Sequence, residues 1–357
     1  MIDVATNIFI TLFGVFFFLS VILIHEAGHF FTAKLSGIRV NEFAIGMGPK
    51  IFSFKRSETL YTIRALPIGG FCAMEGEDEK SNSEDSFNSK SVWARILVIS
   101  AGAILNILLG LLLNFILLAQ KPCFASMTIE KFADNSVSEK SGLQASDTIK
   151  YFNGYSVSSE RDLNFAISTT KSSEVNITVE RNGKKINLDK VEFGTEKLND
   201  GKEYIKADFF LKKINKNIFS WIVESFKDTV STVKIVWFST IGLITGKINI
   251  KEVSGPIGIV TAVGKAASTG LQTNILKAVE NITFMMMLIT VNLGVFNLFP
   301  LPALDGGRLV FLVIEALTKK HIPRKYEGLI HATGLILLIL TMVVFSFGDI
   351  VRIIKGG

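Results

Sequence analysis

The chain has 357 residues, of which 48% are hydrophobic and 20% are charged, and its formal net charge is +6. A mean hydropathy of +0.41 is high for a soluble enzyme, and the composition excludes a disordered chain, a collagen-like chain and a disulfide-rich scaffold. The 38 basic residues are scattered and opposed by 32 acidic ones. The net charge therefore indicates basic flanks of a membrane protein and no nucleic-acid partner.

Four stretches contain no Asp, Glu, Lys or Arg: residues 4–24, 96–120, 281–304 and 328–348. A helix needs about 20 apolar residues to cross a bilayer, so the sequence predicts a multi-pass protein with four transmembrane helices. The first stretch lacks a basic n-region and a convincing cleavage site, which favours a retained helix over a signal peptide.

The basic residues predict the orientation of these helices. Nine Lys or Arg residues lie between the first and second stretches and five lie between the third and fourth. Short cytoplasmic loops are enriched in such residues. We therefore expect both loops to face the cytoplasm, with the termini and residues 121–280 on the outer side.

Residues 37–74 show strand periodicity. Apolar and polar side chains alternate over residues 38–43 and again over 59–64. Strand backbone near a membrane must be paired or must line a wet cavity. We expect paired strands here, followed by a solvated linker over residues 75–90.

Residues 126–193 are typical of a small α+β domain. Two Asn-Gly pairs, Asn153-Gly154 and Asn182-Gly183, lie between short runs with strand periodicity, and residues 159–171 have helical spacing. Residues 218–246 are apolar but interrupted by charges, which favours an amphipathic helix at the outer membrane interface. An ordinary helix that covers the soluble domain is the alternative.

The strongest local motif is His25-Glu26-Ala27-Gly28-His29. Side chains at positions i and i+4 share one helix face, so both imidazoles can bind one metal ion. Glu26 can then reach a metal-bound water without binding the metal itself. Ionisable groups at the end of an otherwise uncharged span are costly, which favours a functional role.

Asp305 is the best candidate for a third ligand. It follows the third stretch, on the same predicted side as the histidine pair, within a segment in which Pro300 and Pro302 must interrupt a helix. A carboxylate at an interfacial helix end is the alternative. His331, alone on the fourth stretch, is expected to be a packing residue.

These motifs resemble those of the site-2 protease family of intramembrane zinc metalloproteases, in particular the bacterial regulator-of-sigma-E protease (RseP) type. The resemblance covers nearly the whole chain. It rests on the motifs at residues 25–29, 43–50, 67–78, 87–93, 254–259 and 297–307.

The resemblance implies that His25, His29 and Asp305 hold Zn²⁺ and that Glu26 is the general base. It also implies that residues 37–74 form a membrane-associated β-loop. The substrate would then be bound by Asn297 and by the edge of this β-loop, with candidate residues Ile68, Gly69, Gly70, Phe71 and Met74. The α+β domain resembles a single PDZ domain. Two positions depart from the family pattern: Ser146 stands where Gly is common, and Ala103 replaces a frequent Pro three residues before Asn106.

The expected fold is a membrane α-helical protein with four transmembrane helices, a membrane-associated β-loop and an inserted extracytoplasmic α+β PDZ-like domain. The expected location is the bacterial inner membrane, with the active site on the cytoplasmic side and both termini outside. The expected segments are 1–36 (first membrane helix), 37–94 (β-loop and linker), 95–120 (second helix), 121–200 (PDZ-like domain), 201–275 (amphipathic helix region), 276–308 (third helix), 309–327 (cytoplasmic loop), 328–348 (fourth helix) and 349–357 (tail).

The expected activity is hydrolysis of a peptide bond in or near the membrane segment of single-span proteins, anti-sigma factors or remnant signal peptides, by zinc-activated water and Glu26. A metal-dependent transporter is one alternative, but it would place ligands on several spans and show an internal repeat, and neither is visible. An inert scaffold that recruits partners through the PDZ-like domain is another, but it would not need a carboxylate between the two histidines.

Overall fold

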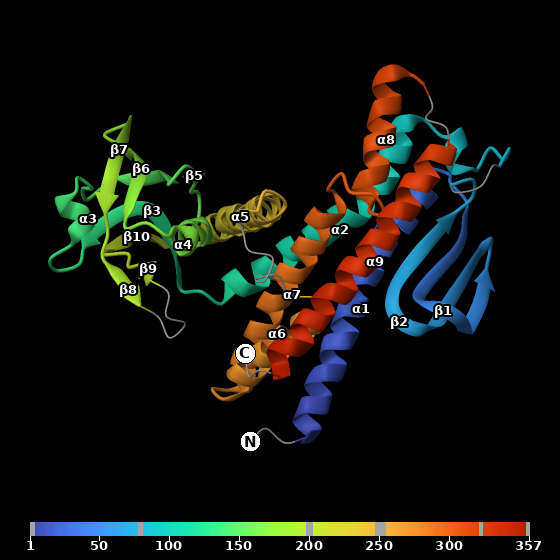
Figure 1. The fold of residues 1–357 in the computed structure, drawn as a ribbon, viewed down its shortest axis with the longest axis horizontal. Helices are drawn as coiled ribbons and strands as arrows, with labels where there is room; N and C mark the ends of the chain where they lie inside the picture. Colours follow the sequence, from blue (N-terminus) through green and yellow to red (C-terminus); the bar gives the residue numbers. More distant parts are fainter. Residues whose placement is uncertain (1–3, 78–80, 198–202, 247–254, 321–323, 355–357) are drawn as a thin grey trace. The chain divides into compact units, whose positions relative to one another are not determined.

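The chain divides into two compact units, which we call the helical unit and the inserted unit. The helical unit comprises Met1–Leu113 and Ser239–Gly357, and the inserted unit is Asn114–Phe238. The structure, a computed structural model, is shown in Figure 1. It describes residues 4–77, 81–197, 203–246, 255–320 and 324–354.

The helical unit is built around long apolar helices. Its helices are α1 (Val4–Leu35), most of α2 (Val92–Ala119), α6 (Pro256–Leu271), α7 (Ile275–Asn297), α8 (Asp305–Thr318) and α9 (Arg324–Ile354). Within the described ranges, four helices are long and apolar enough to cross a membrane: α1, α2, α7 and α9. In Figure 1, α6 runs alongside α1, α7 and α9. The sequence therefore predicted the apolar helices correctly.

Glycines allow α1, α2 and α7 to approach closely. A β-carbon on Gly28 of α1 would lie 2.6 Å from the Ala101 carbonyl oxygen of α2. A β-carbon on Gly294 of α7 would lie 2.8 Å from the Ala103 carbonyl oxygen. Since no side chain fits at either position, the backbones of these helices pack directly against one another.

Two long strands, β1 (Val40–Arg56) and β2 (Thr59–Met74), form the β-loop beside α1 (Figure 1). Each strand curls back, so residues 42–45 of β1 pair with residues 60–63 of β2 on one side and with residues 70–73 on the other. Residues 52–56 pair with the far side of 59–63. Among the described strands, residues 70–73 therefore have one paired side and form an edge, which we call the edge segment.

A small apolar core lies beneath this sheet. It joins side chains of the strands to the end of α1, the start of α2 and α8: Ala33, Ile38, Val40, Cys72, Met74, Phe87, Val98, Ile99 and Leu312. Phe87 and Ser86 are 6% and 1% exposed, so part of the expected solvated linker is buried. The Phe87 backbone amide donates to the Glu75 carbonyl at 2.7 Å, which ties this segment to the sheet.

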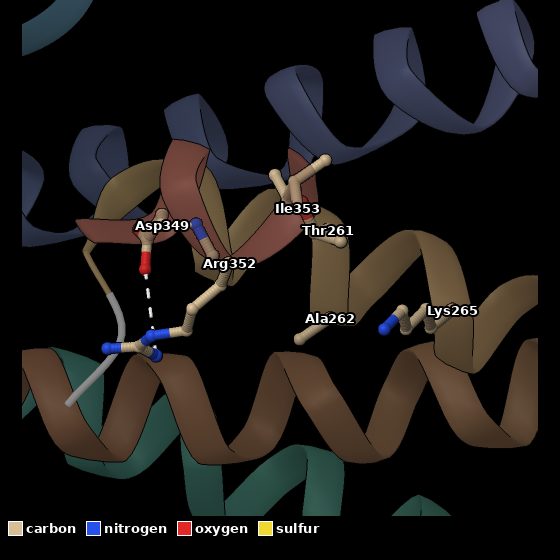
Figure 2. A pocket seen from close by; sticks show the side chains of 7 residues that line it. Thr261, Ala262, Lys265, Asp349, Arg352 and Ile353 are labelled. Carbon is tan, nitrogen blue, oxygen red and sulfur yellow. Dashed lines mark hydrogen bonds and ion pairs between the residues drawn. The ribbon is translucent and has the colours of Figure 1, made fainter. Parts of the chain in front are cut away.

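The start of α6 is bound to the end of α9 by the carboxylate of Asp349, which Figure 2 shows beside Arg352 of the same helix. Asp349 is 3% exposed, and its Oδ2 accepts a 2.8 Å hydrogen bond from the Gly258 backbone amide. Arg352 lies 3.9 Å from Asp349 Oδ1, beside a cavity of about 190 Å³ between the two helices. Asp349 thus satisfies one of the amides that a helix leaves unpaired at its start.

The inserted unit contains an antiparallel sheet with helices. The strand order is β10 (Phe209–Asn215), β3 (Cys123–Phe132), β4 (Thr148–Phe152), β6 (Glu174–Arg181) and β7 (Lys184–Glu192), and β5 (Tyr155–Ser156) pairs with β4. The short strands β8 (Thr195–Lys197) and β9 (Glu203–Ile205) form a separate pair. Both expected Asn-Gly turns are present, since Asn153, Gly154, Asn182 and Gly183 all have positive φ.

Two helices of the inserted unit meet at a buried carboxylate. Helix α4 (Glu160–Thr169) starts at its N-cap Ser159 and carries Asp162, which is fully buried. Asp162 accepts hydrogen bonds from Ser231 at 2.9 Å and Lys234 at 2.7 Å, both on α5 (Ile218–Ile244). The part of α5 within this unit therefore covers the α+β domain, as the alternative interpretation held. Its large apolar side chains remain exposed, including Phe219, Ile222, Phe226 and Val230.

The structure differs from two expected segment boundaries. Helix α7 ends at Asn297 and α8 begins at Asp305, so the interruption predicted from Pro300 and Pro302 lies within the expected segment 276–308. Residues 309–318 of the expected loop 309–327 belong to α8. The sheet of the inserted unit includes β10, which starts at Phe209, beyond the expected limit at residue 200.

Candidate metal centre

Helix α1 places two imidazoles side by side. His25 and His29 are 7% and 6% exposed, and their Nε2 atoms are 3.2 Å apart. Because the residues are four apart on a helix, their side chains project from one face. The Nδ1 atom of His29 lies 2.9 Å from the Val98 carbonyl oxygen. A carbonyl can only accept, so Nδ1 carries the proton and Nε2 of the neutral ring presents a lone pair.

Asp305 lies next to these two histidines although it is far from them in the sequence. Its Oδ2 lies 3.1 Å from His25 Nε2 and 3.3 Å from His29 Nε2. One ligand atom from each of the three residues lies within 4.8 Å of the others. Two imidazole nitrogens and a carboxylate oxygen in such proximity need a cation or protons between them, and this donor set suits zinc with one position left open. The residues present therefore fit the ion that the sequence implied.

Helix α2 contributes backbone and side-chain contacts behind the ligands. A β-carbon at Gly102 would lie 2.4 Å from His29 Nε2 and 2.9 Å from His25 Nε2, so only glycine leaves room for the site. The Asn106 side chain is fully buried, with Nδ2 at 3.4 Å from His25 Nδ1. Its Oδ1 has no hydrogen-bond partner among the described residues. Rotating the amide by half a turn would let Oδ1 accept the His25 Nδ1 proton, the arrangement that a ligating Nε2 requires.

Sequence reasoning did not assign roles at the metal centre to Val98, Gly102 or Asn106. Gly102 and Asn106 are four residues apart on an uncharged stretch, so they share a helix face, and a buried amide in such a stretch needs a partner. That spacing was the available signal. The Val98 contact uses a carbonyl, which every residue carries, so no sequence signal exists for it.

Glu26 lies between the three candidate ligands and the edge segment. A β-carbon at Gly70 would lie 3.2 Å from Glu26 Cγ, and the Cys72 backbone amide donates to the Glu26 carboxylate. The carboxylate also interacts electrostatically with His29, His25 and Asp305. Burial raises the pKa of the nearby Cys72 thiol to about 12, so this cysteine is not a nucleophile at neutral pH.

The candidate substrate-binding residues fall into two groups. Asn297, the last residue of α7, lies with its Nδ2 3.4 Å from His25 Nε2. Gly70 and Phe71 lie on the edge segment, and Gly69 has a φ of 78° just before it. Met74 is 7% exposed and its side chain belongs to the core, which leaves its backbone for contact with a substrate. The Ile68 side chain lies outside the described part of the structure.

Comparison with known proteins identifies the class. Residues 13–341 match Peptidase family M50, which is the site-2 protease family, and the chain belongs to it. It is a zinc metalloprotease, and its four apolar helices suit a membrane-embedded protease. The earlier alternatives of a transporter and an inert scaffold are thereby set aside.

Individual relatives cover almost the whole chain. A Clostridium acetobutylicum protein named "Putative zinc metalloprotease" is 37% identical over 334 residues, which span 92% of this chain and 94% of that protein. The "Regulator of sigma-W protease RasP" of Bacillus subtilis is 29% identical over 427 residues, covering 97% and 98%. The "Zinc metalloprotease RasP" of Shouchella clausii is 31% identical over 428 residues, with the same coverage.

Proposed function

We propose that this protease hydrolyses a peptide bond within or near the transmembrane segment of single-span membrane proteins, of the anti-sigma-factor or remnant-signal-peptide class. The observation that carries the proposal is the convergence of His25, His29 and Asp305 next to the edge segment, within a bundle of apolar helices. The name of the Bacillus relative, a regulator of sigma-W protease, supports the anti-sigma-factor class.

His25, His29 and Asp305 are the proposed zinc ligands. When bound there, zinc supplies a Lewis acid that polarises a carbonyl and makes water more acidic. The Val98 carbonyl and the Asn106 amide hold the two imidazole rings from behind. This support fixes the ring orientation and keeps both Nε2 atoms directed at the same point.

Glu26 is the proposed general base. It takes a proton from the attacking water and returns it to the amine of the leaving peptide. The Cys72 amide and the close backbone of Gly70 hold its side chain beside the candidate ligands. The same two residues belong to the edge segment, so the base and the substrate-binding strand are fixed relative to each other.

The edge segment is the proposed binding site for the unwound substrate. A transmembrane helix satisfies its own backbone groups, so its peptide bonds become accessible only after local unwinding. Residues 70–73 can then pair with the freed backbone by strand addition, and the Asn297 amide, 3.4 Å from His25 Nε2, can hold the substrate backbone near the reacting bond.

We further propose the orientation expected from the sequence, in the bacterial inner membrane. The exposed apolar side chains of the β-loop, including Ile51, Phe52 and Phe54, support its association with the membrane. In the same proposal the α+β domain is a PDZ-like unit on the outer side that restricts the access of bulky substrates, and the apolar face of α5 rests on the interface.

Replacement of the base tests the proposal directly. Glu26→Gln should retain bound zinc but lose about 10²–10⁴-fold in cleavage of a single-span substrate in proteoliposomes, because the amide cannot accept the proton. Zinc content by elemental analysis and cleavage by gel assay are measured on the same preparation. Glu58→Gln, whose carboxylate pairs with Lys34 at the surface of the β-loop, is the matched control and should cleave normally. Cleavage at the wild-type rate by Glu26→Gln would refute the mechanism.

A further inference from the structure

The loop between α7 and α8 contacts helix α9 at two positions. A β-carbon at Gly334 would lie 2.2 Å from Pro302 Cβ, so the α9 backbone touches the loop directly. One helical turn earlier, His331 Nδ1 accepts a 3.1 Å hydrogen bond from the Ala303 backbone amide. Residues three apart share a helix face, so one face of α9 supports the loop two residues before Asp305.

Ala303 has a backbone conformation that it would not adopt by itself. Its φ is +72°, in the left-handed region that a β-carbon disfavours. Such a conformation persists only where the surroundings hold it. The described contacts that hold Ala303 are the His331 acceptor and the packing of the adjacent Pro302 on Gly334.

This turn determines where Asp305 lies. The Leu304 amide donates to the Leu301 carbonyl at 3.3 Å across the turn, and α8 begins at Asp305 immediately afterwards. The close packing continues into α8, since a β-carbon at Gly307 would lie 3.2 Å from His331 Cε1. A shift of the Ala303 peptide therefore moves the carboxylate relative to the two imidazoles on α1.

We infer that His331 is a positioning residue of the metal centre. By accepting a hydrogen bond from the Ala303 amide, it fixes the position of the Asp305 carboxylate and thereby raises the affinity for zinc. The inference rests on the proposed function, because Asp305 is a zinc ligand under that proposal. The described contacts of His331 are with the Ala303 amide and the Phe311 ring, so its effect passes through the backbone of the loop.

The test measures zinc affinity by competition with a chromogenic chelator, on the full chain in detergent. His331→Leu replaces the imidazole by an apolar side chain of similar bulk that has no acceptor. Its zinc affinity should fall about 10-fold to 100-fold, as happens when a residue that orients a metal ligand is replaced. His331→Asn places an amide oxygen near the position of Nδ1 and should remain within about threefold of the wild type. Equal affinities of these two variants would overturn the inference.

A second pair of variants separates positioning from misfolding. Glycine accepts a positive φ without strain, so Ala303→Gly combined with His331→Leu should recover part of the affinity lost by His331→Leu alone. No recovery would count against the inference. Asp305→Ala in the same assay tests the proposed function, because zinc binding by this variant would refute the ligand set. If Asp305→Ala binds no zinc but His331→Leu binds zinc with wild-type affinity, only the role of His331 is refuted.

Discussion

The inserted unit and the helical unit each contain a tight turn with positive φ, and the two turns are stabilised in different ways. In the inserted unit the hairpin between β6 and β7 turns at Asn182 and Gly183, with φ values of 52° and 73°, and these residue types prefer that conformation. In the helical unit Ala303 turns the chain with a φ of 72° and depends on His331 and Gly334 of another helix. The turn chemistry is local at Asn182 and Gly183 and is supplied from a distance at Ala303.

The largest expected effect comes from the close contact between Gly102 of α2 and the two imidazoles. Gly102→Ala should lower zinc affinity by about 100-fold or more and abolish cleavage, because the new β-carbon would lie 2.4 Å from His29 Nε2. Gly348→Ala on α9, where a β-carbon meets nothing within 4 Å, is the control and should bind zinc normally. Zinc binding by Gly102→Ala equal to that of the control would show that α2 can withdraw from the site.

A smaller effect is expected from a carboxylate of the inserted unit that has distant partners. Asp208 accepts from the Val137 and Ser138 amides at 2.8 and 3.0 Å, at the start of α3 (Val137–Lys140). Asp208→Ala should destabilise this region by about 2 kcal/mol, measured by hydrogen exchange on the full chain. Asp189→Ala, at an exposed position, should change exchange little, and equal protection in both variants would contradict the prediction.

The same carboxylate should make the region sensitive to acid. Burial alone would raise the pKa of Asp208, but hydrogen bonds from Ser138, Ser136 and Val137 lower it below its usual value. A carboxylate with a lowered folded pKa contributes stability above its unfolded pKa and loses it as the pH falls through the folded pKa. Protection of β3 amides should therefore decline in acid in the wild type, and the decline should be smaller in Asp208→Ala.

The smallest effect concerns a turn whose residue does not suit it. Ser146 has a φ of 72° and an exposed side chain, a backbone conformation that glycine adopts with less strain. Ser146→Gly should stabilise the inserted unit by about 0.5–1 kcal/mol, the strain relieved less the entropy of glycine. Ala145→Gly next to it, where φ is not positive, should destabilise slightly. Changes of opposite sign in the stability of the inserted unit, measured by hydrogen exchange on the two variants, would show that this turn is controlled by its own residue types.

This contrast explains what the sequence could predict. The four apolar helices, the spacing of His25 and His29 and both Asn-Gly turns follow from local patterns, and the structure contains them. The interruption at Pro300 and Pro302 was predicted, but the exact end of α7 at Asn297 was not, because the uncharged stretch continues to residue 304. The pairing of β10 with β3 was missed for a related reason, since the two strands are about 80 residues apart and no local signal connects them.

The curled pairing of the β-loop could be predicted only in part. Alternation over residues 38–43 and 59–64 predicted strands, but it could not show that residues 42–45 pair on both sides. A two-sided strand depends on where the chain folds back, which is set by several pairings together. The edge segment next to Glu26 follows from that register.

The hydrogen bond from His29 to the Val98 carbonyl has a practical consequence for mutagenesis. Every amino acid at position 98 keeps the oxygen that orients the ring, so an alanine scan would report only the loss of the buried Val98 side chain and would not reveal that this oxygen is needed. Backbone chemistry, such as an ester in place of the neighbouring amide to weaken that oxygen as an acceptor, would reveal a dependence that libraries of encoded variants overlook.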